Sequence, residues 1–329
     1  MLPRKNMRRF SLPFLLLCCL LNVSVGYSQA NRRAAMDYVN RGTKELELGN
    51  LITALAHFNR AIELDPNYAA SYFSRGLVRK RQSDYDGAIS DLTRSIELHP
   101  MAEAYLDRGA TRKDKGDRDG AIADYNRAIE IDSEYADAFY NRGIARDDKG
   151  DYDGAISDFT RAIELRPANA RAFVGRGFAR MHQGNPDSAI VDYSKAIELN
   201  PRGFLGFYNR AFARKQKGDL DGAIADFNAA LEINPLDVDA WFERGVLRGA
   251  KSDLDGALAD LGKSIELNPR NARAHANRGM IMLLRRQDIE AQKEFDAALK
   301  IDSSLKTDLA KSIGQIIKAR EQPPVVRRP

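Results

Sequence analysis

One sequence pattern recurs every 34 residues, and once after 33, from residue 35 to residue 305. The segment Gly-Ala-Ile-x-Asp begins at Gly87, Gly120, Gly154 and Gly222. With Ala35 as position 1, the repeats are 35–68, 69–102, 102–135, 136–169, 170–203, 204–237, 238–271 and 272–305. A fixed period of this length is typical of an array of stacked supersecondary units, which sets the architecture of residues 31–305.

Each repeat is predicted to form two helices. Positions 1 to 14 contain no proline and have helical apolar spacing, and a Gly-Asp turn often follows, as at Gly150-Asp151. The second helix runs to a proline at position 32 in six of the repeats. Position 8 is glycine or Ala211, position 20 is always alanine and position 24 is bulky. Small residues allow close packing of the two helices, but one hairpin cannot bury both its faces, so neighbours must stack.

These positions resemble the tetratricopeptide repeat family over residues 35–305. The resemblance implies an all-α fold, a right-handed α-solenoid of helical hairpins whose first helices line a concave groove. It also implies a non-catalytic scaffold that binds protein or peptide. A helix at 306–320, with Leu305, Leu309, Ile313, Ile316 and Ile317 on one face, is expected to cap the last repeat. Residues 321–329 are expected to be disordered.

Two rows of arginine depart from the family pattern. Position 7, usually apolar in the family, is arginine in all eight repeats, and position 11, usually tyrosine, is arginine in six. Position 23 supplies a carboxylate wherever position 11 is arginine, and the first repeat lacks both. We therefore predict structural ion pairs rather than a basic ladder for nucleic acid. The predicted pairs involve Arg112, Arg146, Arg180 and Arg214, with Asp124, Asp158, Asp192 and Asp226.

The resemblance implies that positions 2, 5, 9, 12 and 13 line the groove. The lysine and asparagine that hold a peptide carboxylate in some family members are absent from positions 5 and 9. These positions are apolar instead, and they are predicted to contact a partner or, alternatively, to form the core between repeats. The candidate groove residues are Phe73, Leu77, Tyr140, Ile144, Val174, Phe178, Tyr208, Phe212, Phe242 and Val246.

Residues 1–30 have the order of a secretory signal peptide: a basic start, an apolar run and small residues. Cleavage is expected after Ser28-Gln29-Ala30, with Ser24-Val25-Gly26 as the alternative site. The mature chain is therefore expected to be exported, to the periplasm or the medium. The alternative is a membrane anchor at residues 10–25, which is the only basis for expecting contact with a membrane. Both cysteines, Cys18 and Cys19, lie in this segment.

No motif in the repeats indicates catalysis, and no metal or cofactor is expected. The four histidines occupy different repeat positions, and the paired aspartates follow the repeat period at the inter-helix turn, where they are expected to cap the second helix. Four of the five net positive charges belong to the first 30 residues, so the remainder does not attract nucleic acid generally. The alternatives left open are an envelope component that binds glycan or peptidoglycan and an accessory subunit of an envelope enzyme. Oligomeric state is not predicted.

Overall fold

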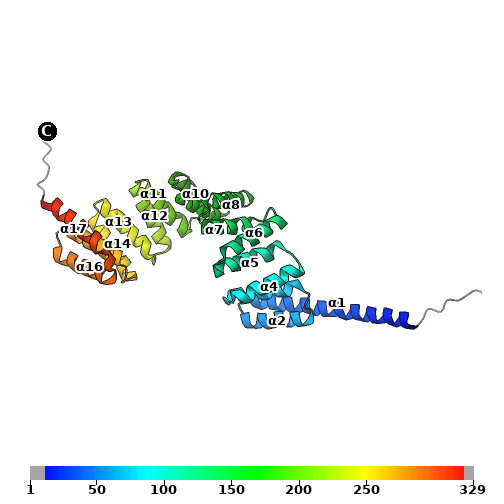
Figure 1. Ribbon diagram of the computed structural model, residues 1–329. Coiled ribbons are helices and arrows are strands. Elements are labelled where there is room, and N and C mark those ends of the chain that lie inside the picture. Colours follow the sequence, from blue (N-terminus) through cyan, green and yellow to red (C-terminus); the bar gives the residue numbers. More distant parts are fainter. Residues whose placement is uncertain (1–11, 322–329) are drawn as a thin grey trace, which may run out of the picture. The chain divides into compact units, whose positions relative to one another are not determined.

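The computed structural model describes residues 12–321, and side chains from 28 to 320. Residues 1–11 of the predicted signal peptide and residues 322–329 of the predicted tail lie outside this range, while Glu321, the first residue of that tail, ends the last helix. Seventeen α-helices and one short 3-10 helix account for the structured part of residues 12–321, with no strand, which confirms the all-α solenoid fold (Figure 1). The chain divides into two compact units, Met1–Leu165 and Arg166–Pro329, and each is described by itself.

The first unit contains four helix pairs, in which each odd-numbered helix packs against the next even-numbered one. The helices are α1 Leu12–Glu47, α2 Leu51–Leu64, α3 Ala69–Arg81, α4 Tyr85–Leu98, α5 Ala102–Lys115, α6 Arg118–Ile131, α7 Ala136–Asp147 and α8 Tyr152–Leu165. Helix α1 starts within the predicted signal peptide and continues into the first repeat. Among the residues whose side chains are described, 28–320, no helix is long and apolar enough to span a bilayer.

The second unit contains four more pairs and a terminal helix. Its elements are α9 Ala170–His182, α10 Pro186–Leu199, α11 Phe204–Gln216, α12 Leu220–Ile233, α13 Val238–Ala250, α14 Leu254–Leu267, α15 Ala272–Leu284, α16 Asp288–Ile301, η1 Ser303–Leu305 and α17 Lys306–Glu321. Leu309 of α17 is buried against Leu283 and Phe295. Ile317, expected on the same covered face, is instead 42% exposed.

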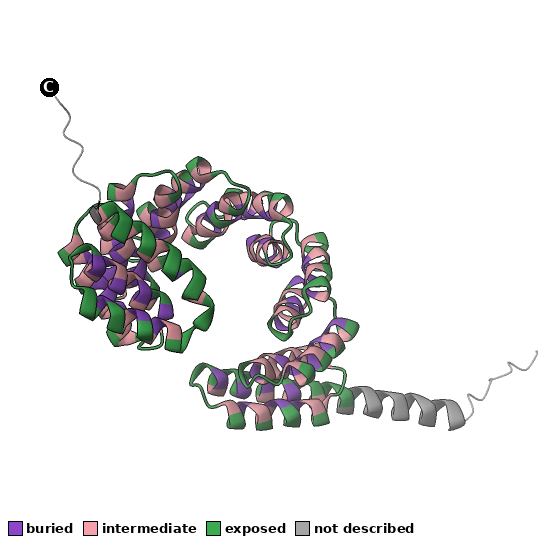
Figure 2. Cartoon of the chain, turned by 60° about the vertical axis from the view of Figure 1, so that its left-hand side comes forward, coloured by how far each residue is buried: buried purple, intermediate pink, exposed green. Residues whose placement is uncertain are grey.

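Close helix packing depends on the glycine at position 8. A Cβ atom at Gly143 would lie 2.9 Å from Cε1 of Phe159, the position-24 ring of the same repeat. Ala155 and Ala162, at positions 20 and 27, are fully buried in the same hairpin. Figure 2 shows buried residues on the facing sides of paired helices. The small residues therefore make room for one large side chain in each hairpin.

The turn between the two helices requires a left-handed residue at position 15. Glycine takes this conformation in five repeats, as at Gly150 with φ 80°. Ser83, Ser252 and Arg286 take it in the other three, with φ of 62°, 66° and 61°. The tight turn is therefore kept even where the residue carries a side chain, at some cost in backbone strain.

The aspartate that follows this turn caps the second helix, as predicted. Asp151 Oδ1 accepts a hydrogen bond from the Gly154 amide at 3.0 Å, and Asp84, Asp117, Asp219 and Asp253 act in the same way. The second aspartate has a different role in four of these pairs, at Asp86, Asp119, Asp221 and Asp255. Asp86 Oδ1 lies 2.5 Å from Nζ of Lys115 in the following repeat. These exposed contacts join neighbouring repeats, but each contributes less than about 1 kcal/mol.

The predicted arginines and aspartates meet inside each hairpin. Asp158 is 2% exposed, and its carboxylate accepts hydrogen bonds from Arg142 Nε at 2.9 Å and Nη2 at 2.6 Å. Arg146 Nη1 donates a hydrogen bond to Oδ2 of the same carboxylate at 2.8 Å. The same trio of two arginines and one aspartate forms in repeats 2 to 7, around Asp91, Asp124, Asp158, Asp192, Asp226 and Asp260.

The position-7 arginine also links neighbouring repeats, a contact that the sequence analysis missed. Arg142 Nη1 donates to Oδ1 of Asn126 in the preceding repeat at 2.6 Å, and its guanidinium carbon lies 5.4 Å from the Phe139 ring centroid. Arg210 makes the equivalent hydrogen bond to Ser194 Oγ at 2.9 Å. Because these guanidinium groups already donate hydrogen bonds to acceptors within the protein, they are not placed to bind phosphate.

The last repeat lacks the complete arrangement. Glu294 replaces the aspartate and is bound by Arg278 Nη2 at 2.5 Å and His275 Nδ1 at 2.7 Å. Gly262 occupies position 25 of the preceding repeat, where a polar acceptor would otherwise stand. The Arg278 Nε atom is buried and has no hydrogen-bond acceptor in the described part of the chain. Fewer polar contacts therefore fix the packing of the last repeat on the preceding one than fix the packing of the other repeats.

Candidate functional site

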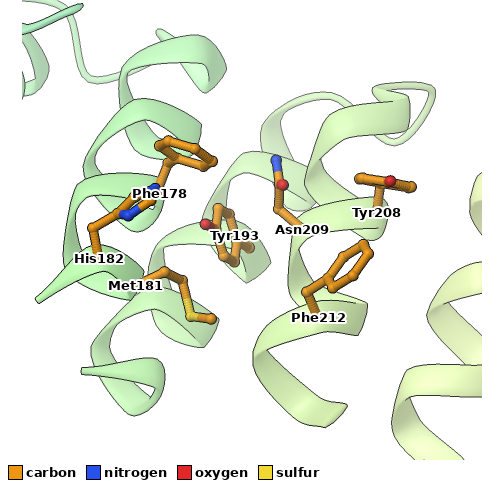
Figure 3. Close-up of a pocket in the computed structure, with 7 residues that line it drawn as sticks. All are labelled: Phe178, Met181, His182, Tyr193, Tyr208, Asn209 and Phe212. Carbon is orange, nitrogen blue, oxygen red and sulfur yellow. The ribbon is translucent and has the colours of Figure 1, made fainter. Parts of the chain in front are cut away.

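The second unit contains a pocket of about 360 Å³ between the first helices of two adjacent repeats. Phe178, Met181 and His182 come from α9, Tyr208, Asn209 and Phe212 come from α11, and Tyr193 of α10 lies between the two groups (Figure 3). Most of these side chains are aromatic or apolar. This combination of concavity, apolar walls and few polar groups is typical of a ligand site.

The residues at positions 12 and 6 differ between this junction and the next one along the chain. Where α11 meets α13, these positions hold Lys215 and Glu243, whose charged atoms lie 2.6 Å apart. Where α9 meets α11, the same positions hold Met181 and Asn209, which form no ion pair and leave the space between the helices open.

The aromatic side chains that line the pocket pack against one another and against a buried ring of the core. The Phe212 ring centroid lies 5.5 Å from that of Phe227, and the Tyr208 ring lies 5.0 Å from that of Phe212. On the opposite wall the Phe178 and His182 rings are 4.6 Å apart in an edge-to-face arrangement. Edge-to-face contacts restrict the ring orientations, so the pocket is largely formed before a ligand binds.

One amide in the pocket has no partner within the described residues. Asn141 and Asn277 occupy the same repeat position as Asn209, and each donates from Nδ2 to the carbonyl oxygen four residues earlier at 2.8 Å. Asn209 makes no such bond, and its side chain lines the pocket. It can therefore donate and accept hydrogen bonds to a ligand.

The Tyr208 hydroxyl stays protonated over the physiological range. Burial, together with the nearby carboxylates of Asp239, Asp237 and Glu243, raises the pKa of Tyr208 to about 12. The hydroxyl therefore remains a neutral group that can donate or accept a hydrogen bond at the pocket.

Three of the ten candidate groove residues, Phe178, Tyr208 and Phe212, line the pocket. Val174 packs against the core around Tyr193, and Val246 against the core around Leu261. In the first unit the other candidates are half-buried; they are Phe73, Leu77, Tyr140 and Ile144.

Phe242 is a correction to the sequence analysis. Its side chain is 4% exposed and packs in the core with Leu261 and Ile281. The Arg273 guanidinium carbon lies 4.8 Å from its ring centroid and covers it further. Because the α15 side chains close over the ring, Phe242 cannot contact a partner in this structure.

The sequence analysis missed four residues of the pocket, namely Met181, His182, Tyr193 and Asn209. The first two occupy positions 12 and 13, which the family resemblance already assigned to the groove. Tyr193 stands at the core position 24 and is 1% exposed, so only its pocket-facing edge is available. Nothing in the sequence marks Asn209, because it occupies the same repeat position as Asn141 and Asn277, whose side chains bond to the backbone of their own helices.

The described residues contain no group of three or more histidines, cysteines or acids that could hold a metal ion. The histidines with described contacts serve packing or pairing: His57 lies against the Tyr38 ring, and His275 against Glu294. The architecture is that of a helical-repeat scaffold, in which tandem hairpins present side chains of their first helices.

Comparison with known proteins assigns the family. A model described as TPR repeat matches residues 42–83, 109–146 and 213–251. A second, described as tetratricopeptide repeat, matches 136–169 and 170–202. Together they cover more than half of the chain, and the second begins at the first residues of repeats 4 and 5. The chain belongs to the tetratricopeptide repeat family, whose members are typically non-catalytic scaffolds for protein interaction.

Similar proteins support the same assignment. Tetratricopeptide repeat protein 36 of Mus musculus is 41% identical over 58 residues, which are 18% of this chain and 31% of that protein. The Homo sapiens protein is 43% identical over 58 residues, with the same 18% and 31% coverage. The chain thus spans about a third of the length of these curated relatives.

Solved structures match over a larger share of the chain. A tetratricopeptide repeat protein from Parabacteroides merdae has a TM-score of 0.58 at 19% identity, covering 81% of this chain and 99% of that one. The C-terminal part of a repeat-containing protein from Cytophaga hutchinsonii has a TM-score of 0.57 at 21% identity, covering 72% and 97%. At these identities the likeness shows the fold.

Proposed function

We propose that this chain binds a protein or peptide segment and that the pocket between α9 and α11 holds an apolar side chain of that segment. The observation that supports this most directly is the pairing of aromatic walls with the unpartnered amide of Asn209. The walls would bury the side chain, and the amide would hydrogen-bond the backbone beside it. This division between apolar anchor and polar contact is common in peptide recognition.

The burial of the rings favours a peptide over a glycan. A sugar stacks on an open aromatic face, whereas Tyr208 and Phe212 are half-buried against Phe227 and present edges as well as faces. Among the pocket rings, Phe178 and His182 are exposed, Tyr208 and Phe212 are half-buried and Tyr193 is buried. An apolar side chain fits this enclosed, mostly apolar volume better than a hydroxylated ring does.

Replacing Phe178 with alanine should weaken peptide binding by at least about tenfold, because it removes one wall of the pocket. The probe is a random peptide phage library selected on the full chain, and the affinities of recovered peptides are then measured by calorimetry. Val191→Ala is the matched control, since Val191 is an exposed apolar residue of the same unit that does not line the pocket. Equal affinities for both variants, or no peptide enriched by the unmodified chain, would contradict the proposal.

We further propose that the chain is exported and acts in the periplasm or outside the cell. The support is the order of basic, apolar and small residues in the first 30 positions. The pocket itself is independent of this proposal.

Mass spectrometry of the protein isolated from its native source should find a mature N-terminus close to Asn31. Signal peptidase cleaves after small residues, and Ala30 ends the best-placed small-residue sequence. An intact Met1 on protein recovered from the cytoplasm would contradict export, while an intact Met1 in the membrane fraction would favour the anchor at residues 10–25.

A further inference from the structure

The face of the second unit beside the pocket belongs to α13. Ala240 and Leu247 of this helix pack in the same core cluster that supports Tyr208 and Phe212. The first turn of α13 is acidic, with Asp237 at the cap and Asp239 after it. A segment that leaves the pocket toward α13 would therefore pass carboxylates.

Two of the three carboxylates in this region are already engaged. Asp237 Oδ1 accepts a hydrogen bond from the Ala240 amide at 2.8 Å, and Glu243 is paired with Lys215. Asp239 is exposed and has no hydrogen bond or ion pair to its side chain within the described residues. An incoming cation would therefore meet Asp239 without displacing an existing contact.

We propose that the bound segment carries a lysine or arginine about three residues from the side chain that fills the pocket, and that Asp239 binds this cation. The inference rests on the proposed peptide-binding function. Helices α11 and α13 are neighbours in the array, joined by the Lys215–Glu243 pair, and neighbouring helices lie on the order of 10 Å apart. An extended chain advances about 3.3 Å per residue, so three residues bridge the distance from the pocket to α13.

The electrostatics of the pocket rim agree with a basic ligand. Apart from burial, the groups that raise the pKa of Tyr208 are three carboxylates, and Asp239 has the largest effect among them. The three basic groups on α11 are all paired: Arg210 and Arg214 with Asp226, and Lys215, whose Nζ lies 5.8 Å from the Phe212 ring centroid, with Glu243. An acidic residue in the segment would be repelled from this side, so charge would also orient the peptide in the groove.

The test is to select the same random peptide phage library on the unmodified full chain and on the Asp239→Asn variant. The unmodified chain should enrich lysine or arginine about three residues from the apolar anchor, and the variant should lose that enrichment. Resynthesised peptides with the basic residue changed to glutamine should bind the unmodified chain about two- to fivefold more weakly, as expected for an exposed ion pair. The glutamine peptides and the parent peptides should bind the Asp239→Asn variant with equal affinity.

Glu232→Gln is the matched control, because Glu232 is an exposed acid of the same unit that does not line the pocket. It should leave the enrichment unchanged. Peptides that bind through Phe178 but show no basic preference, or a preference that persists in Asp239→Asn, would overturn this inference and leave the proposed function standing. Failure to enrich any peptide would instead remove the proposed function and the inference with it.

Discussion

The Asp158→Ala variant should lose about 3 kcal/mol of stability, and up to about 5 kcal/mol if water cannot relax around the remaining charges. Asp158 is almost fully buried and accepts hydrogen bonds from both Arg142 and Arg146. Removing it leaves two guanidinium groups facing each other inside one hairpin. The Arg146 side chain retains 25% exposure, so partial hydration places the expected loss near the lower figure.

Chemical denaturation followed by circular dichroism would measure this loss. Lys149→Ala is the control, because Lys149 pairs with Asp119 on the surface of the same unit, where both side chains are exposed. Such a pair contributes less than about 1 kcal/mol. If Asp158→Ala unfolds at the same denaturant concentration as the unmodified chain, the trio of charges does not stabilise the hairpin.

A Phe227→Ala substitution should cost about 3–5 kcal/mol and should abolish peptide binding as well. Phe227 is fully buried in α12, and its ring supports Tyr208 and Phe212 from below. Its removal would leave a cavity beneath the pocket, into which the two rings could tilt. The loss would therefore appear both in thermal unfolding and in calorimetric affinity.

Phe178→Ala provides the contrast within the same unit. Phe178 is 42% exposed, so its removal should change stability by less than about 1 kcal/mol while still weakening binding. The two substitutions thus distinguish Phe227, which supports the pocket from within the core, from Phe178, which is proposed to contact the ligand. A large loss of stability for Phe178→Ala would show that the proposed pocket wall is part of the core.

The hairpin architecture and the pairing of its charges followed from the sequence, because both are local. The aspartate at position 23 lies 16 residues after the position-7 arginine and 12 after the position-11 arginine, as Asp158 does after Arg142 and Arg146. A two-helix hairpin fixes where such residues meet. The same locality made the caps at Asp84 and its equivalents predictable.

The link between Arg142 and Asn126 was not predictable in this way, because its two ends belong to different repeats. Position 25 varies among asparagine, serine, threonine, glycine and aspartate, so its role is not apparent from residue type. The packing of one hairpin on the next brings the position-25 side chain to Nη1 of the position-7 arginine, the nitrogen that does not bind the aspartate. Only then does the glycine at 262 become recognisable as a missing acceptor.

The repeat period by itself determined the helical class, the hairpin boundaries and the apolar character of positions 5 and 9. The tertiary structure decided which of those apolar residues face a ligand. Phe212 lines a pocket because Met181 and Asn209 leave space beside it, while Phe242 is buried because Ile281 and Arg273 close over it. The reason is that each side chain's exposure depends on the neighbouring repeat, which lies 34 residues away in sequence and in contact in space.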